Sequence, residues 1–343
     1  MPIVGLNFGR TTFRAVELDK KKDGLIISNI GTYENPKINF LSDQKEDIDK
    51  IASHIADFFK EMGFGTSHIV MGLDESQVFM RIIKVPAMSD KELRSAVRYE
   101  AEQYIPLPLD QINLSYQRLD PDLTEKDKIN VQVVAAKKDV LERYVMIAKK
   151  AKLVPYAIEP ETVALGRVLG DSADAPLGTI IMDMGFSGTI IVVTYGGTVR
   201  FTRSIPMGGD VITRAIQQEL NLDAQQAEEY KKVYGMDPMQ AEGKILNVIR
   251  PVIDNLILEV NRATVFFTKH NTSANIKRLI LTGGTALMPE LLTYIAKNVD
   301  FEVQLANPLA NFRFSPKLEP RRKDLNLEGP MYSTAVGLAL REI

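Results

Sequence analysis

The 343-residue sequence contains no cysteine and only three histidines, which lie far apart in the chain. The absence of cysteine excludes disulfides, thiolate metal sites and a cysteine nucleophile, and it agrees with a reducing compartment. No stretch approaches the roughly 18 consecutive apolar residues that a membrane-spanning helix needs. The first residues, MPIVGLNFGR, also lack the basic and apolar regions of a secretory signal. We therefore expect a cytoplasmic protein without direct membrane insertion, which reaches a membrane only through another protein.

An excess of one charge is also missing. The 42 basic and 44 acidic residues give a net charge of −2, so there is no global attraction to nucleic acid or anionic lipid, and we expect no nucleic-acid partner. Hydrophobic residues at 45% and charged residues at 25% are typical of soluble globular proteins. The chain is too long for one typical domain, which favours two lobes.

A strand-turn-strand pattern occurs twice, about half the chain length apart. Asn7 and Gly9 stand in a turn between two apolar strands, and Asp183 and Gly185 stand in the same pattern in the second half. Each turn is followed by hydroxyl side chains. A protein built by duplicating this unit explains the recurrence better than chance.

Paired hairpins of this kind suit nucleotide binding. Glycine lets backbone amides approach phosphate oxygens, hydroxyl groups donate to them, and carboxylates hold magnesium through water. The candidate phosphate-binding residues are Gly9, Thr11, Thr12, Asp183, Gly185, Ser187 and Thr189. Each hairpin taken alone is more typical of an ordinary β-turn.

Two further segments are candidates for the nucleoside. Gly283, Gly284 and Thr285 follow a buried-looking strand and would lie against adenosine and phosphate, although close packing explains such glycines as well. Glu228 and Lys231 lie three apart on one helical face and would hydrogen-bond a ribose. A solvated ion pair is the alternative for that spacing.

The section between the two halves has a different character. Ser89 and Glu92 have the spacing of a capping box, so we expect a helix there. Two strands and a second helix follow, which indicates an inserted α+β subdomain. The expected divisions are 1–85 for the first part of lobe 1, 86–154 for the insertion, 155–178 for the return to lobe 1, 179–330 for lobe 2 with a helical subdomain, and 331–343 for a closing helix.

The order of these segments resembles the superfamily of actin, Hsp70, MreB and FtsA from end to end. Within it, the chain resembles the PilM family of type IV pilus assembly proteins. The segments that carry this resemblance are Val85-Pro86-Ala87-Met88, Tyr99-Glu100-Ala101-Glu102-Gln103-Tyr104-Ile105-Pro106, Ala135-Ala136-Lys137-Lys138 and Pro206-Met207-Gly208-Gly209-Asp210.

The resemblance implies an α/β, actin-like (ribonuclease H-like), two-lobed duplicated fold with an inserted α+β subdomain. It also implies a cytoplasmic scaffold that binds ATP with Mg²⁺ and captures the amino-terminal peptide of a PilN-like bitopic inner-membrane protein, alongside other components of the pilus inner-membrane complex. The peptide would lie in a groove between the insertion and the first lobe. The groove candidates are Tyr99, Glu102, Tyr104 and Ile105, for which burial in the core of an amphipathic helix is the alternative.

The chain departs from the family in its first hairpin, which usually reads Asp-Ile-Gly-Ser. Asn7 cannot supply the negative charge that positions hydrated magnesium, so metal binding should depend more on Asp183. Arg10 either contacts a phosphate or fills the phosphate site and excludes nucleotide. Glu159 matches the acidic residue that orients the attacking water. Together these features predict at most a slow ATPase.

Two alternatives share the fold. One is a self-polymerising cytoskeletal ATPase like FtsA or MreB, and self-assembly into a ring or filament stays open. The other is a sugar or acetate kinase, which is disfavoured because the sequence offers no convincing second-substrate site.

Overall fold

The computed structural model describes residues 1–22, 24–35, 37–105, 107–119, 123, 127–172, 174–271 and 274–342. Pro106, at the end of the predicted groove motif, and Ile343, at the end of the predicted closing helix, lie outside this set. The α-helices in the described part are α1 (Lys45–Met62), α2 (Asp90–Glu102), α3 (Lys138–Lys150), α4 (Glu161–Leu169), α5 (Gly209–Leu220), α6 (Ala224–Tyr234), α7 (Lys244–His270), α8 (Leu291–Ala296), α9 (Arg322–Glu328) and α10 (Ser333–Ala339). None of these described helices combines the length and apolar character that crossing a bilayer demands.

The first half of the chain builds five strands of a six-stranded sheet, and β14 from near the end of the chain adds the sixth. Its strands, in spatial order, are β14 (Arg313–Phe314), β3 (Gly24–Glu34), β2 (Thr12–Lys21), β1 (Ile3–Phe8), β4 (His68–Leu73) and β8 (Val154–Pro160). Strands β1, β2 and β3 pair antiparallel, whereas β1, β4 and β8 pair parallel. Helices α1 and α3 pack on this sheet through one core that includes Ile51, Phe58 and Ile147.

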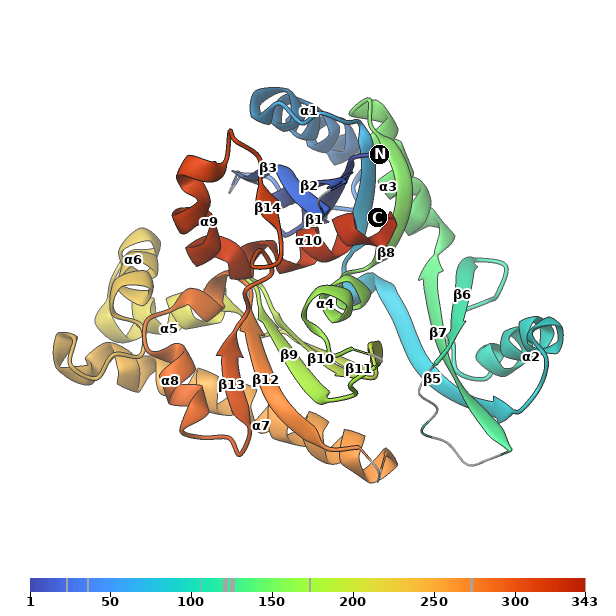
Figure 1. Ribbon diagram of the computed structural model, residues 1–343. Helices are drawn as coiled ribbons and strands as arrows, with labels where there is room; N and C mark the ends of the chain where they lie inside the picture. The colour runs from blue at the N-terminus through green and yellow to red at the C-terminus, as the bar shows by residue number, and fades with distance from the viewer. Residues whose placement is uncertain are drawn as a thin grey trace.

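The second half repeats this topology in a five-stranded sheet. Its strands, in spatial order, are β11 (Thr198–Ile205), β10 (Thr189–Tyr195), β9 (Gly178–Met184), β12 (Ile276–Thr282) and β13 (Glu302–Leu305). Again three consecutive strands pair antiparallel and the next two pair parallel. Figure 1 shows the two sheets as separate layers, with α10 and α4 between them. The order and directions match those of β3-β2-β1-β4-β8, which fits the duplication expected from the two turns.

The helix α10 lies against both β1 and α4 at very short range. A Cβ atom on Gly5 of β1 would come 2.0 Å from the carbonyl oxygen of Ala335, and one on Gly337 would come 2.1 Å from that of Ala164. Because real Cβ atoms do not approach backbone so closely, both positions require glycine. The small residues of the closing segment therefore allow the close packing of the layer between the sheets.

The insertion is a three-stranded antiparallel sheet covered by α2. Its strands, in spatial order, are β5 (Val78–Pro86), β7 (Lys128–Lys137) and β6 (Ile112–Arg118). The predicted capping box is present, since the Ser89 hydroxyl accepts from the Glu92 amide and the Glu92 carboxylate accepts from the Ser89 amide at 3.0 Å. Leu93 and Val97 of α2 pack on the sheet.

The sheet of the insertion does not coincide with the expected division at 86–154. Strand β5 pairs with β7 from Val78 onward, so the sheet starts before residue 86. At the other end, Tyr144 and Ile147 of α3 belong to the core of the first half. The strand β5 looked from the sequence like a continuation of the first sheet, because strand pairing between distant segments leaves no local pattern.

Candidate functional site

The first hairpin joins β1 to β2 and leaves a buried side-chain atom without a partner among the described residues. The Gly9 amide donates to the Thr12 carbonyl oxygen at 2.7 Å, which closes the turn. Arg10 at its tip is exposed, and Thr11 and Thr12 are half-buried. The side-chain oxygen Oδ1 of Asn7 is buried and has no hydrogen-bond partner among the described residues. A buried amide oxygen in this state is a natural acceptor for a ligand or its water.

The second hairpin, between β9 and β10, is bonded into its surroundings. The Gly185 amide donates to the Gly188 carbonyl oxygen at 2.9 Å, and the Gly185 carbonyl accepts from the Gly209 amide at 3.0 Å. Ser187 is exposed at the turn. The Thr189 hydroxyl, in contrast, is buried and donates to the Met207 carbonyl oxygen at 2.7 Å. Thr189 therefore holds the following chain in place, and its hydroxyl does not face a phosphate as expected.

The Gly283-Gly284-Thr285 turn packs directly on the second hairpin. Gly283 has a φ of +85°, and a Cβ there would come 2.4 Å from Oδ1 of Asp183. The Thr285 hydroxyl donates to the Gly185 carbonyl oxygen at 3.1 Å. Only glycine combines this backbone conformation with so close an approach.

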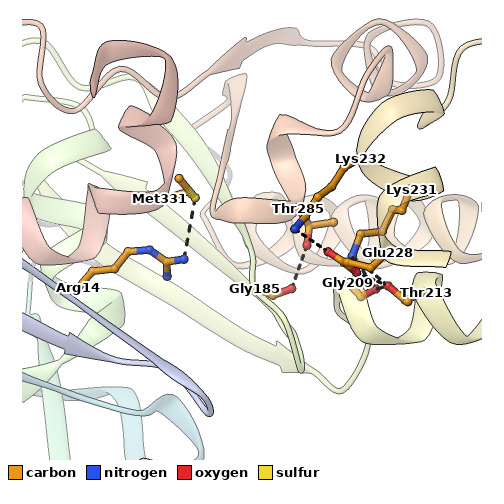
Figure 2. A network of polar contacts seen from close by, with 9 residues as sticks. All are labelled: Arg14, Gly185, Gly209, Thr213, Glu228, Lys231, Lys232, Thr285 and Met331. Atoms are coloured by element: carbon orange, nitrogen blue, oxygen red, sulfur yellow. Dashed lines mark hydrogen bonds and ion pairs between the residues drawn. The ribbon is translucent and has the colours of Figure 1, made fainter. Parts of the chain in front are cut away.

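Arg14 connects the first hairpin to the same region. Its Nη2 atom donates to Sδ of Met331 at 3.9 Å, and Sδ lies 3.8 Å from the position of a Cβ on Gly284. Its Nε atom is buried without a partner among the described residues. Figure 2 shows Arg14 and Met331 on one side and Gly185 and Thr285 on the other. Arg14 of the first half and the second hairpin with Thr285 thus face one region, as a ligand site shared by both halves requires.

Asp183 is half-buried beside the Gly283 turn. Burial raises the pKa of Asp183 to about 6, against the opposing effect of the positive charge of Arg14. Burial also lowers the pKa of Arg14, which Asp183 partly offsets. The two side chains come from opposite halves of the chain, so the charge of each depends on the position of the other.

Glu159 and Glu161 lie two residues apart but have opposite surroundings. Both oxygens of Glu159 accept from Arg167, at 2.5 and 2.8 Å, and Oε2 also accepts from Arg341 at 2.5 Å. Since three donors occupy this carboxylate, the structure does not fit the role of orienting water that the sequence suggested for Glu159. It instead ties β8 to α4 and to the end of the chain.

Glu161 is the buried acid without such partners. Its Oε1 atom has no hydrogen-bond partner among the described residues. Burial raises the pKa of Glu161 well above its usual value, and the nearby carboxylates of Asp74, Asp183 and Glu75 raise it further. A buried group with a perturbed pKa among charged neighbours is typical of a functional site.

The side-chain oxygen atoms at Asn7 and Glu161 fit a hydrated magnesium ion. Oδ1 of Asn7 and Cγ of Glu161 lie 2.8 and 3.2 Å from the position of a Cβ on Gly72, so the two side chains are neighbours. Both present buried oxygens without partners. Within the described ranges, no three His, Cys, Asp or Glu side chains are grouped closely enough to hold a metal directly. Oxygen donors at longer range suit contact through the water shell that magnesium keeps.

Glu228 and Lys231 form a compact network rather than an exposed ion pair. The Lys231 ammonium donates to Glu228 Oε2 at 2.6 Å, to the Thr213 hydroxyl at 3.0 Å and to the Gly209 carbonyl oxygen at 3.1 Å. Burial lowers the pKa of Lys231, and the carboxylate of Glu228 partly offsets this. The network lies beside Thr285 (Figure 2). It therefore borders the region of the two hairpins, while the predicted contact with a ribose stays a prediction.

Comparison with known proteins assigns the family. A family model described as type IV pilus assembly protein PilM matches residues 5–343. The chain belongs to the PilM family. A chain of a solved PilM-PilN type IV pilus biogenesis complex is 26% identical, with a TM-score of 0.83 over 99% of this chain and 98% of that one. The predicted resemblance to PilM is confirmed.

More distant similarities agree with this assignment. The cell division protein FtsA of Bacillus subtilis (strain 168) is 22% identical over an alignment of 381 positions, which covers 98% of this chain and 82% of FtsA. MreB 5 of Spiroplasma citri bound to AMPPNP is 14% identical, with a TM-score of 0.53 over 98% of this chain and 94% of MreB. The MreB likeness extends to the fold alone, and it confirms the predicted actin-like fold of this PilM-family chain.

An apolar groove opens at the end of the insertion in this PilM-family chain. It has a volume of about 280 Å³ and is lined by Ser76, Gln77, Val78, Phe79, Ile105, Leu107, Ile112, Ala135, Ala136 and Lys137. Of the four predicted groove residues only Ile105 lines it. Tyr99 is 70% exposed, Glu102 is exposed, and the Tyr104 ring lies under the Arg81 guanidinium at 4.2 Å. Helix α2 turns Tyr99 and Glu102 outward, because its buried face is occupied by Leu93 and Val97, whereas Tyr104 follows the end of the helix.

Sequence reasoning missed Glu161 and Arg14. The segment Glu159-Pro160-Glu161 contains two acidic residues, and the sequence does not show which of them contacts an arginine. Arg14 had a signal, since it stands between the apolar Phe13 and Ala15 near the start of a strand. A charged side chain in a buried strand is expected to face a partner or a ligand.

Proposed function

We propose that this PilM-family chain is a nucleotide-binding scaffold on the cytoplasmic side of the inner membrane, where it serves type IV pilus assembly and holds the amino-terminal peptide of a PilN-like protein. The likeness to a chain of the PilM-PilN complex over nearly the full length of both chains carries this proposal. The division into two lobes and an insertion belongs to the same proposal, with the nucleotide between the lobes and the peptide at the insertion.

The proposed nucleotide site uses residues of both halves. Amides at Gly9 and Gly185, with the hydroxyls of Thr11 and Thr12, would bind phosphate oxygens. The Gly283-Gly284 turn would lie against the nucleoside, beside the network of Glu228 and Lys231. Magnesium would add positive charge near the phosphates, held through water by Asp183, Asn7 and Glu161.

Hydrolysis in this site is expected to be slow. Phosphoryl transfer depends on positioning and charge stabilisation, and Asn7 supplies no charge to the metal. Glu161, rather than Glu159, is the acid in position to orient a water molecule, because its Oε1 atom is buried and free of other donors in the described structure. Its raised pKa favours the neutral form, which is a poor base until a cation approaches.

The groove suits a short apolar peptide segment. Its walls are mainly aliphatic and aromatic, and among the described residues that line it Lys137 carries the charge. An extended peptide needs pockets of this kind for alternate side chains. A carboxylate or a backbone carbonyl of the peptide would lie near Lys137.

Titration calorimetry with ATP, in magnesium and in EDTA, tests the nucleotide site. We expect micromolar binding that weakens in EDTA, and turnover of γ-labelled ATP slower than once per minute. Absence of binding in both buffers would reject nucleotide binding, and many turnovers per minute would reject the slow ATPase. Binding of the amino-terminal peptide of the partner, with a scrambled peptide as control, tests the groove.

A second candidate function is a self-polymerising filament like that of FtsA. The end-to-end similarity to FtsA favours keeping this candidate. Sedimentation with magnesium and ATP discriminates between the two. A scaffold stays in the supernatant at micromolar concentration, whereas a filament appears in the pellet and in negative-stain images.

A further inference from the structure

An open depression lies at the β14 edge of the first sheet, where the chain leads from β14 to α9. It has a volume of about 580 Å³ and is lined by Phe314, Pro316, Glu319 and Pro320. Figure 1 shows β14 and α9 far from α2 and β6 of the insertion. The depression is therefore separate from the apolar groove, and its lining residues are not those of the candidate nucleotide site.

The walls of this depression are fixed before any ligand arrives. Pro316 and Pro320 have no amide donor and a restricted φ, so the walls they form are apolar and stiff. The Ser315 amide donates to the Ile27 carbonyl oxygen of β3 at 3.0 Å, and the Glu319 amide donates to the Ser315 carbonyl oxygen at 3.0 Å. Because the loop is already ordered, a ligand that binds here does not have to order it.

The chain around the depression is basic, although the protein as a whole is not. Residues 316–324 contain two acidic side chains and four basic ones, which are Lys317, Arg321, Arg322 and Lys323, while the full chain has a net charge of −2. All four basic residues are exposed. Charges at the rim of an interface attract a partner of opposite charge, so this surface favours an acidic ligand.

Arg322 brings a positive charge to the apolar floor of the depression. Its guanidinium carbon lies 5.4 Å from the centroid of the Phe314 ring. Its Nη1 atom donates to Oε1 of Glu319 at 3.1 Å. The side chains of Arg322 and Glu319 are 50% and 52% exposed, so water weakens this ion pair and little is lost when another carboxylate replaces Glu319.

We propose that this depression docks an extended acidic segment of a partner protein, with an apolar side chain on Phe314 and a carboxylate on Arg322 in place of Glu319. An anionic bilayer would meet the basic rim but would not fill the apolar floor, whereas an extended peptide supplies both kinds of side chain. Docking here needs neither nucleotide nor a peptide in the apolar groove, so it stands apart from the proposed function. The chain can then hold two partners at once.

Panning of a phage-displayed library of random short peptides on the full-length chain tests this docking. Recovered peptides should be enriched in Asp and Glu beside an apolar residue, and fluorescence polarisation should show binding that weakens at high salt. Arg322→Glu should weaken the binding of these acidic peptides about tenfold, because it replaces attraction with repulsion. Glu319→Gln should instead tighten it about threefold, because it removes the carboxylate that competes for Arg322. A merely structural role of Glu319 would not give tighter binding.

Lys91→Glu is the matched control, because it makes the same charge reversal at an exposed residue of α2. Urea unfolding checks that each variant folds like the wild type. The docking is overturned if no acidic peptide is recovered, if Arg322→Glu binds the recovered peptides as tightly as the wild type, or if Glu319→Gln binds them no more tightly. Cosedimentation with vesicles of phosphatidylglycerol and phosphatidylcholine that Arg322→Glu abolishes, without recovery of an acidic peptide, would assign the surface to a membrane instead.

Discussion

The two halves of the chain share a topology but differ in how their hairpins are held. In the second half, the carbonyl of Gly185 accepts from Gly209 and Thr285, so the turn is bonded before any ligand arrives. In the first half, Asn7 and Arg14 each have a buried polar atom without a partner among the described residues. Duplication has thus preserved the path of the backbone while the side-chain chemistry diverged. We infer that the second hairpin is preorganised and that the first completes its contacts with the ligand.

The largest test compares Gly283, which packs on the second hairpin, with Gly9 of the first hairpin. Gly283→Ala should lower the free energy of unfolding by about 3 kcal/mol, because φ is positive and the Cβ would meet Asp183 and the Met184 carbonyl oxygen. Gly9→Ala should cost less than about 1 kcal/mol, since its Cβ meets mainly the movable Thr12 hydroxyl at 2.9 Å. Urea unfolding of both variants measures the difference. Equal losses would contradict the view that only the second hairpin is rigidly packed.

The next test separates the two acids that lie between the halves. Glu159→Gln should lower the free energy of unfolding by about 2 kcal/mol, because Arg167 and Arg341 lose their charged partner. Glu161→Gln should leave stability equal or higher at pH 7.5 while it removes residual ATP hydrolysis. Urea unfolding measures the stability of each variant, and γ-labelled ATP measures its rate of hydrolysis. The assignment fails if Glu159→Gln is the variant that loses hydrolysis at unchanged stability.

Asp183 and Asn7 occupy equivalent turns and test how the halves share the metal. Asp183→Asn should weaken magnesium-ATP binding about tenfold, or about 1.4 kcal/mol, because it removes the charged donor. Asn7→Asp should instead increase the ratio of the ATP affinity in magnesium to the ATP affinity in EDTA. Calorimetry in both buffers gives this ratio for each variant. If Asp183→Asn bound magnesium-ATP as tightly as the wild type, the metal would not depend on the second hairpin.

The smallest effect concerns the junction of the halves at Glu75. Burial raises the pKa of Glu75 to about 7, so the folded state holds a proton that the unfolded state releases near pH 4.5. Stability is therefore lost as pH rises between these values, since folding above pH 7 buries a charge. The free energy of unfolding of Glu75→Gln, relative to that of the wild type, should be about 1 kcal/mol higher at pH 8 than at pH 5. Urea unfolding of both proteins at the two pH values checks this. A larger relative stability of Glu75→Gln at pH 5 than at pH 8 would contradict it.

Local patterns were enough to predict several parts of this fold. The turns after Asn7 and Asp183 were predictable because a glycine turn between alternating apolar residues is a local signal. The capping box at Ser89 was predictable for the same reason. The limits of the insertion were not, because β5 could pair with either the first sheet or β7, and its own residues suit both.

By itself, the sequence determined the two glycine hairpins, the insertion between them and the membership of the PilM family, because each depends on neighbouring residues or on their order along the chain. Only the tertiary structure decided that Glu159 contacts arginine and Glu161 does not. The strand β8 ends at Pro160 and α4 begins at Glu161, so the backbone changes direction between the two acids. Which of the two acids contacts an arginine then depends on where α10 packs. Arg167 donates to the carbonyl oxygen of Gly337 in α10, and Arg341, which follows α10, donates to Glu159, so these contacts join segments that lie far apart in the sequence.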